Sequence, residues 1–343
     1  MMRVLITHSL FPPDFAGGGE YYVLRTAQQL QAQRIDVRVL TTGDPSVTEY
    51  GGIETVRLPI HPYRMNLKSR TIEEHARDVD LIHTFNYHAM LPSRQAARRL
   101  SKPVVCTVLG FFREAWLEMR GPLAGRAFEK FEQFLATRSY SKLVFLSDYS
   151  RDQCLSLGID PQLAIVNEPG VDLDGFNADH AKENVALFVG KLTPRKGLDE
   201  LVSSARALPH VHFRIVGWGP EEPRLRRIAP DNVEFLGFLE GQTLRDEFNR
   251  AQIFVLPSKA EGLPSVVLEA MAAGCAIVCT LPLDFSGRKV PVGDVGALGE
   301  AIGSLWADPA EAAELGRQNR SLAEQFTWDR HARKLIDVYT ELV

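Results

Sequence analysis

Two glutamates, Glu261 and Glu269, flank the start of an expected helix and are well placed to accept hydrogen bonds from a polyol. The preceding run 253–257 is short, apolar and β-prone, which predicts a buried parallel strand. Pro264 suits the first position of a helix, and Gly274 suits its C-terminal cap. Glu261 is therefore expected at the carboxyl end of a strand beside a helix N-terminus, where open α/β sheets bind ligands.

Spacing alone leaves two interpretations of this pair open. In the first, Glu269 lies about a turn and a half into the helix, and the two carboxylates contact an elongated ligand at separate points. In the second, Glu261 caps the helix and Glu269 is a solvated helix residue. The spacing itself favours the second interpretation, so the rest of the chain has to decide.

Three cations, Lys191, Arg195 and Lys196, follow the expected strand 186–189. Cations grouped before a helix can hold a diphosphate and stabilise negative charge on a leaving phosphate. The alternative is solvated surface charge, which we prefer for Arg195. We prefer the phosphate role for Lys196, because Gly197 directly after it allows a ligand to approach closely.

Glycine-bearing loops follow further expected strands, over 17–20, 217–220 and 237–239. The first opens a helix, so its backbone amides can approach a ligand, but it is neither the dinucleotide G-x-G-x-x-G motif nor a phosphate loop with lysine. The loop at 237–239 suits backbone contact with a nucleobase. Each signal is unspecific by itself. With the loops around 190–197 and 258–264, however, the second half of the chain has four glycine- or charge-bearing loops at the carboxyl ends of its expected strands.

Strands and helices alternate throughout, which predicts parallel sheets covered by helices on both faces. The first helix is expected over 20–32. The expected strands are 3–7, 37–40, 55–58, 80–83, 104–108 and 143–146 in the first half, and 186–189, 213–216, 233–236, 253–256 and 276–278 in the second.

A chain of 343 residues exceeds one comfortable domain, and the alternation restarts after a turn-rich stretch near 168–175. We expect an N-terminal Rossmann-like domain over 1–167, a linker over 168–183 and a C-terminal Rossmann-like domain over 184–327. The final helix, 328–343, is expected to pack back on the first domain. A cleft between two such domains suits a reaction with two substrates.

Composition is ordinary, with 45% hydrophobic and 24% charged residues. The net charge of −4 gives no reason to expect nucleic-acid binding. We expect neither a signal peptide nor a membrane span. The four cysteines, Cys106, Cys154, Cys275 and Cys279, lack zinc-ligand spacing, which predicts buried free thiols in a reducing cytoplasm.

The helix expected over 123–138 has apolar residues at positions 124, 127, 128, 131 and 135. A membrane-surface role is one interpretation, but the sequence mixes Arg126 and Lys130 with Glu129 and Glu132, so we expect this helix to pack on the core. The aromatic and basic stretch 111–116 leaves two alternatives open, an acceptor-site border or core packing.

The motifs together carry a family resemblance that spans nearly the whole chain. The chain resembles the retaining glycosyltransferases of family 4, which have the two-domain GT-B fold, two doubly wound α/β domains facing each other across a cleft. The residues that carry it are Gly17-Gly18-Gly19-Glu20, Gly190-Lys191-Leu192 with Lys196-Gly197, Gly217-x-Gly219-Pro220, Pro257-Ser258 with Glu261-Gly262-x-Pro264, Glu269, Gly170-Val171-Asp172 and Phe326-Thr327-Trp328.

The resemblance implies a hexosyltransferase that uses a UDP- or GDP-sugar, retains anomeric configuration and needs neither metal nor cofactor. It implies that Glu261 contacts hexose hydroxyls, Glu269 holds the ribose and Lys191 and Lys196 hold the diphosphate, with Glu261 and both lysines catalytic. The remaining implied donor contacts are Gly18, Gly19, Gly190, Gly217, Phe238, Leu239, Gly262, Leu263, Pro264 and Ser265. The first domain would bind the acceptor, a glycan, a lipid-linked or a small-molecule hydroxyl, and peripheral membrane contact stays open.

The chain departs from the family pattern at three places. Leu109 stands where the family usually has a histidine near the donor sugar, with His83 and His88 as candidate replacements. Lys191 stands where arginine is common, and the segment 280–293 is short. These departures keep a second hypothesis open, a catalytically weak GT-B protein that binds a nucleotide or supports a partner. A GT-B epimerase or phosphorylase is a third.

Overall fold

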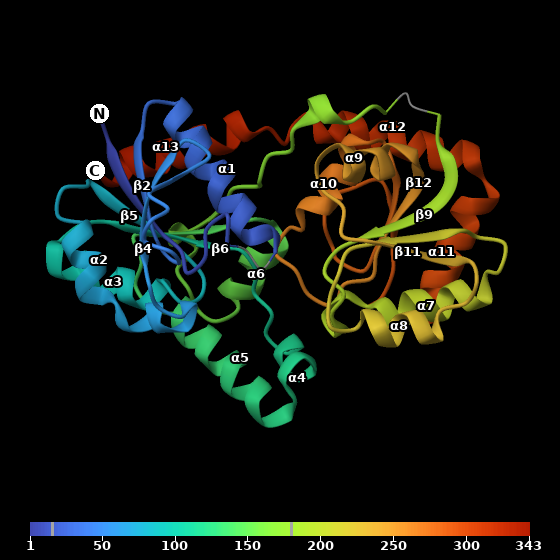
Figure 1. Ribbon diagram of the computed structural model, residues 1–343, viewed down its shortest axis with the longest axis horizontal. Helices are drawn as coiled ribbons and strands as arrows, with labels where there is room; N and C mark the ends of the chain where they lie inside the picture. Colours follow the sequence, from blue (N-terminus) through green and yellow to red (C-terminus); the bar gives the residue numbers. More distant parts are fainter. Residues whose placement is uncertain (15–16, 179–180) are drawn as a thin grey trace. The chain divides into compact units, whose positions relative to one another are not determined.

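The chain divides into two compact units. The computed structural model describes residues 1–14, 17–178 and 181–343. The first unit comprises Met1–Arg113, Ala127–Gly170 and Trp328–Val343, and the second comprises Glu114–Arg126 and Val171–Thr327. Each unit contains one sheet with helices packed against it (Figure 1). The expected linker 168–183 includes two positions, 179 and 180, that lie outside the described residues.

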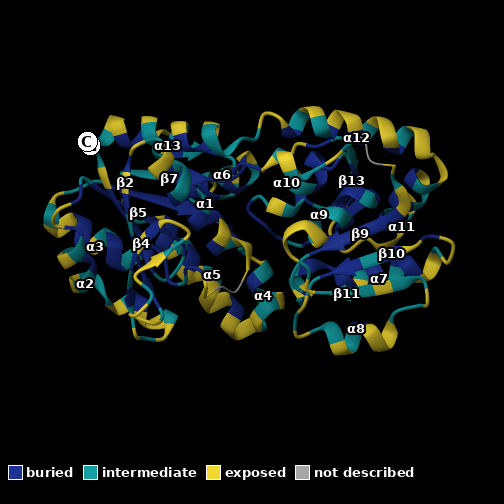
Figure 2. Ribbon diagram, turned by 45° about the horizontal axis from the view of Figure 1, so that its top comes forward, coloured by how far each residue is buried: buried dark blue, intermediate teal, exposed yellow. Residues whose placement is uncertain are grey.

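The sheet of the first unit has the strand order β3-β4-β2-β1-β5-β6-β7-β8. All neighbours are parallel except β3 and β4, which pair antiparallel. The central strands are buried (Figure 2), as expected where helices cover both faces. The strands are β1 Arg3–Thr7, β2 Asp36–Thr42, β3 Glu49–Tyr50, β4 Ile53–Leu58, β5 Leu81–Phe85, β6 Val104–Val108, β7 Lys142–Phe145 and β8 Ala164–Val166.

The last helix of the chain belongs to the first unit, where α13 lies beside α1 (Figure 1). Nε2 of His331 lies 3.3 Å from the hydroxyl of Tyr22, and the hydroxyl of Tyr339 lies 2.5 Å from Nδ1 of His83. These buried contacts make α13 part of the core of this unit. The helices of this unit are α1 Gly18–Ala32, α2 Ser69–His75, α3 Met90–Leu100, α6 Asp148–Leu155 and α13 Trp328–Leu342, with 3₁₀ turns η1 Pro62–Leu67 and η2 Pro161–Leu163. The helix α5 Pro122–Ala136 begins in the second unit and belongs to the first from Ala127 onward.

The sheet of the second unit is parallel throughout, in the order β11-β10-β9-β12-β13-β14. Its strands are β9 Glu183–Val189, β10 Phe213–Val216, β11 Val233–Gly237, β12 Ala251–Leu256, β13 Ala276–Cys279 and β14 Gly287–Lys289. Its helices are α4 Ala115–Arg120, α7 Leu198–Ala207, α8 Glu222–Ile228, α9 Gly241–Arg250, α10 Ser265–Ala272, α11 Val295–Ala307 and α12 Pro309–Ala323, with η3 Leu173–Gly175 and η4 Pro194–Lys196.

The predicted fold class, α/β with two doubly wound domains, is confirmed. Every strand expected from an apolar run is present, with ends shifted by up to three residues. The four cysteines are buried free thiols, as predicted. The sequence placed residues 114–126 in the first domain, whereas they group with the second unit. There α4 contacts η4, and the Glu118 carboxylate pairs with the Lys259 ammonium at 2.8 Å.

The prediction that α5 buries its apolar residues on the core is wrong for most of them. Of the five apolar positions named above, only Leu135 is buried. The face turned inward carries Gly125, Glu132 and Ala136 instead. Glu132 is buried because its carboxylate accepts hydrogen bonds from the N–H groups of residues 112 and 113. Among the described residues, no helix combines the length and apolar character needed to cross a bilayer.

Candidate functional site

A buried ion-pair cluster lies where the loops after β9 and β12 meet in the second unit. Nη1 of Arg195 and Nζ of Lys196 each lie 2.6 Å from the same oxygen, Oε1 of Glu261. The Arg195 guanidinium also donates to the Ala260 carbonyl, and the N–H of Lys259 donates to the Arg195 carbonyl at 2.9 Å. Two cations and one carboxylate give this cluster a net positive charge at the carboxyl edge of the sheet.

Burial and charge act in opposite directions on Glu261. Burial by itself raises the pKa of this carboxyl, but the adjacent Lys196 and Arg195 outweigh it and lower the pKa to about 2. Burial lowers the pKa of Lys196, and Glu261 counteracts that effect. A carboxylate with so low a pKa stays ionised near neutral pH. It is therefore a strong hydrogen-bond acceptor but a weak general base.

The cluster corrects two sequence interpretations. Arg195 is not a solvated surface cation, because its side chain is 17% exposed and paired with Glu261. Glu261 is not a helix cap, because α10 begins after Pro264 with no side-chain cap. The predicted helix end is confirmed: Gly274 follows α10 with φ of 73°.

Two glycines hold the loops around the cluster together. Gly197 has φ of 69°, and a Cβ atom there would lie 2.0 Å from the carbonyl oxygen of Pro257. Gly217 has φ of 138°, and its Cβ would lie 1.9 Å from the carbonyl oxygen of Gly190. Both positions need glycine for backbone conformation and for close packing of neighbouring loops. The structure thus gives a packing reason for Gly197, where the sequence suggested close approach of a ligand.

The third cation of the loop after β9 lies outside this cluster. Nζ of Lys191 lies 4.8 Å from the centre of the Trp218 ring. The N–H of Leu192 donates to the Trp218 carbonyl at 2.8 Å, which ties the loops after β9 and β10 together. Trp218 remains 44% exposed, so this cation and its indole form an accessible surface beside the cluster.

Glu269 lies on α10 and is half-buried, which excludes the solvated-residue interpretation. Burial raises its pKa to about 7, while Arg245 acts to lower that pKa and Asp172 to raise it. Arg245 lies against the η3 turn, where a Cβ at Gly175 would come within 2.2 Å of its Cδ. Sequence reasoning missed Arg245 because a lone arginine on an exposed helix gives no distinctive pattern.

The other predicted donor contacts fall on loops at the same edge of the second sheet or on the first unit. Leu263 and Pro264 are half-buried and lead into the first turn of α10, whose N–H groups lack intrahelical acceptors. Phe238 is 52% exposed after β11. Those in the second unit are Gly190, Gly217, Phe238, Leu239, Gly262, Leu263, Pro264 and Ser265, whereas Gly18 and Gly19 open α1 in the first unit.

In the first unit, Leu109 borders the glycine turn that opens α1. A Cβ at Gly19 would lie 3.2 Å from Cδ1 of Leu109. His83 does not replace the missing histidine, because it is buried in the core and hydrogen-bonded to Thr107 at 2.7 Å. Burial, with a smaller effect of His331, lowers the pKa of His83 to about 3.

His88 contacts residues of the η1 turn. Its Nδ1 is 3.1 Å from Nδ2 of Asn66, and its ring packs edge-on against Tyr63. Burial, with smaller effects of other histidines, lowers its pKa to about 4, so the imidazole is neutral near pH 7. Neither candidate histidine therefore supplies a charged imidazole at the glycine turn.

His8 is a residue of interest that the sequence interpretation missed. It follows β1 at the carboxyl edge of the first sheet, and its Nδ1 lies 2.5 Å from the Leu10 carbonyl oxygen. Burial lowers its pKa, while the Leu10 carbonyl and Glu20 act in the opposite direction. Its position directly after an expected strand could have identified this polar residue as a candidate site residue from the sequence.

The structure favours core packing for two residues of the aromatic and basic stretch 111–116. Phe111 and Trp116 are buried, which supports core packing for both. Phe112 is half-buried, and its N–H donates to Glu132 at 3.0 Å. Arg113 donates to the Ser156 hydroxyl at 3.0 Å.

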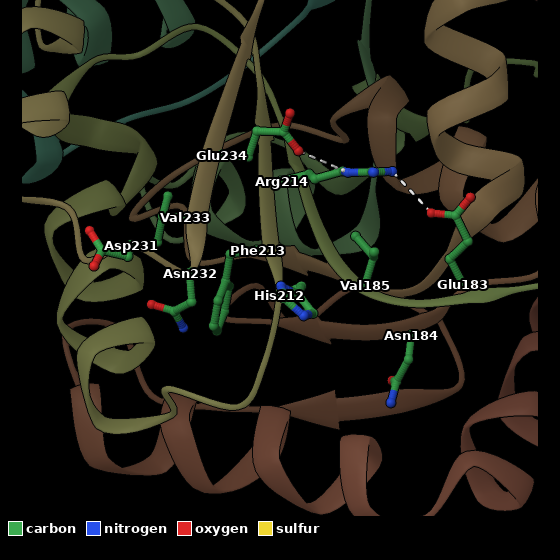
Figure 3. A pocket seen from close by; sticks show the side chains of 10 residues that line it. All are labelled: Glu183, Asn184, Val185, His212, Phe213, Arg214, Asp231, Asn232, Val233 and Glu234. Atoms are coloured by element: carbon green, nitrogen blue, oxygen red, sulfur yellow. Dashed lines mark hydrogen bonds and ion pairs between the residues drawn. The ribbon is translucent and has the colours of Figure 1, made fainter.

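A cavity of about 630 Å³ lies at the opposite, amino edge of the second sheet (Figure 3). Its Arg214 is engaged by the carboxylates of Glu183, Glu234 and Glu247 at 3.2–3.4 Å. Because parallel sheets bind ligands at the carboxyl ends of their strands, we assign the site to the cluster around Glu261.

Comparison with known proteins agrees with the fold and the loops. Residues 16–174 match the family described as Glycosyltransferase Family 4, and residues 183–308 match Glycosyl transferases group 1. This chain therefore belongs to the group 1, family 4 glycosyltransferases, as the motifs predicted.

Curated relatives are similar over almost the whole chain. The alpha-maltose-1-phosphate synthase of Mycolicibacterium smegmatis is 26% identical over 99% of this chain and 100% of its own length. The D-inositol 3-phosphate glycosyltransferase of Saccharomonospora viridis is 27% identical over 95% of this chain and 89% of its own. These relatives favour an active glycosyltransferase over the nucleotide-binding or partner-supporting alternative.

Solved structures show the same fold. A sucrose-phosphate synthase from Thermosynechococcus elongatus superposes with a TM-score of 0.85 at 21% identity, covering 100% of this chain and 99% of that one. Anabaena HepE superposes with a TM-score of 0.80 at 18% identity, covering 100% of both chains. The GT-B fold class follows from these two likenesses.

Proposed function

We propose that this glycosyltransferase moves a hexose from a UDP- or GDP-linked donor to an acceptor hydroxyl with retention of anomeric configuration and without a metal. The observation that carries the proposal is the ionised Glu261, held by Lys196 and Arg195 at the carboxyl edge of the second sheet. Relatives add support: one is named a GDP-mannose-dependent mannosyltransferase, 30% identical over 57% of this chain.

In the proposed reaction, the bond between the anomeric carbon and the β-phosphate oxygen breaks, and a bond to the acceptor oxygen forms on the same face. The acceptor proton goes to the leaving phosphate, so no protein base is needed. This agrees with Glu261, which a pKa of about 2 makes unsuited to proton abstraction. Its role is to accept hydrogen bonds from hexose hydroxyls.

Charge on the leaving diphosphate is stabilised by fixed cations. Lys196 and Arg195 together carry one charge more than Glu261 neutralises, and Lys191 adds another on the same loop after β9. Cations held in place before the reaction stabilise developing charge without reorganisation, and the N-terminus of α10 adds to their field. Glu269 is proposed to hold the ribose hydroxyls.

Substitution of Lys196 is the most direct test. Lys196→Ala leaves Glu261 paired with Arg195, so the buried carboxylate keeps one partner and the fold is expected to survive. We expect nucleotide release from UDP- and GDP-sugars, followed by mass spectrometry, to fall by about 100-fold or more. Lys334→Ala on α13 is the control, with unchanged turnover. Wild-type turnover by a folded Lys196→Ala protein would refute the site.

A further inference from the structure

The outward face of α5 is apolar and cationic. Leu123, Ala127, Phe131 and Phe134 follow one another at intervals of four, four and three residues, which places them along one face of the helix. Leu123 is 89% exposed, Phe131 40% and Phe134 42%. Figure 2 shows exposed residues along α5. Large apolar side chains aligned on an exposed face mark an interaction surface.

Cations accompany this apolar row, and the helix carboxylates are turned away from it. Lys130 and Arg126 are exposed along one side of the row, and Arg138 follows one turn after Phe134. Glu132 lies on the inward face and accepts a hydrogen bond from the Tyr87 hydroxyl. The charges that the sequence seemed to mix are therefore separated by the fold.

The aromatic residues of the row contact one another and a cation. The rings of Phe131 and Phe134 are near-parallel, with centroids 6.5 Å apart. The guanidinium carbon of Arg138 lies 4.2 Å from the Phe134 ring centre. An aromatic surface edged with arginine and lysine suits the boundary between acyl chains and anionic headgroups.

The turn before α5 fixes the start of this helix against α4. Gly121 has φ of 78°, and Gly125 lies so close to α4 that a Cβ would be 2.4 Å from the Trp116 carbonyl oxygen. Glu132 fastens the middle of the helix to the loop at 112–113. The inward face of α5 is therefore packed at Gly125 and hydrogen-bonded at Glu132, and the apolar and cationic face points outward.

We propose that this face of α5, Leu123, Ala127, Phe131 and Phe134 with Arg126, Lys130 and Arg138, docks the enzyme on a bilayer surface that contains anionic lipids. An amphipathic helix with aromatic and cationic residues on one side binds there by apolar insertion and charge attraction. A second copy of this chain fits less well. A two-fold contact would bring the same cations together across the interface.

Vesicle sedimentation tests this proposal without an acceptor. The wild-type protein is expected to bind vesicles with about one third phosphatidylglycerol in phosphatidylcholine and to bind pure phosphatidylcholine weakly. Phe131→Ser with Phe134→Ser is expected to abolish binding. Lys130→Glu is expected to weaken it at least fivefold, the effect of one cation near an anionic surface.

Matched controls distinguish binding through this face of α5 from non-specific binding to vesicles. Tyr63→Ser removes another exposed aromatic side chain, and Arg227→Glu reverses an exposed cation on α8. Both are expected to bind like the wild type. Equal loss in the controls, no wild-type binding, or a dimer that the Phe131→Ser and Phe134→Ser changes dissociate would each overturn the proposal. Nucleotide release by the double variant reports independently on the donor site.

Discussion

Glu269 offers a sharp test of the electrostatics of the site, because one substitution should stabilise the protein in a pH-dependent way. The folded protein holds the Glu269 proton with a pKa of about 7, whereas the usual value is 4.5, because burial disfavours the charge. As the pH rises, the unfolded chain loses this proton near pH 4.5, whereas the folded protein keeps it until about pH 7. The contribution of Glu269 to stability is therefore present below about pH 4.5 and is lost as the pH rises to about 7.

Glu269→Gln removes this titration while keeping a polar side chain of similar size. The interval between the two pKa values corresponds to about 3 kcal/mol, of which about 2.5 kcal/mol falls between pH 5 and pH 8. The free energy of unfolding of the variant, relative to the wild type, should rise by about that amount over this range. If Glu269 also holds the ribose, the stabilised variant should bind UDP or GDP more weakly.

Urea unfolding at several pH values, followed by circular dichroism, measures the difference directly. Subtracting the wild-type curve removes the contribution of the buried histidines to the pH dependence of the free energy of unfolding. Their pKa values are lowered, so their contribution has the opposite sign to that of Glu269. Glu324→Gln, at an exposed position after α12, should run parallel to the wild type. A difference that is independent of pH, or that falls as the pH rises, would refute the reasoning.

Two further predictions concern the loops and the cations. Gly217→Ala should lower the free energy of unfolding by about 2 kcal/mol or more, because its Cβ would overlap the Gly190 carbonyl. Thermal denaturation checks this, with Gly293→Ala as the control for positive φ alone, since nothing lies within 4 Å of its Cβ. Nucleotide release should survive EDTA, because Lys196 and Arg195 supply the positive charge; a strict metal requirement would contradict this.

Much of the fold could be predicted from local pattern. Apolar runs such as 104–108 and 213–216 predicted β6 and β10 with their ends correct, because strands buried on both faces need continuous apolar sequence. Two- and three-residue strands such as β3 and β14 gave no usable pattern. The grouping of 114–126 with the second unit depends on contacts distant in sequence, such as Glu118 with Lys259.

The candidate site was predicted in its parts but not in its connections. Positions after expected strands drew attention to Glu261 and Lys196, although spacing alone favoured a helix cap for Glu261; motif resemblance gave each a role. Neither revealed that Arg195 shares the same carboxylate oxygen, since the two cations are consecutive and only the η4 turn brings both toward Glu261. His8 and Arg245 were missed for a related reason: each is a single polar residue whose environment comes from other elements.

The sequence by itself determined the alternation of strands and helices, the glycine- and cation-bearing loops and the family, because these depend on local composition and on motif order. Only the tertiary structure decided which charges neutralise one another and which faces are buried. Glu261 and Glu269 show the physical reason. Both are glutamates near one helix start, yet cations lower the pKa of one to about 2 and burial raises that of the other to about 7.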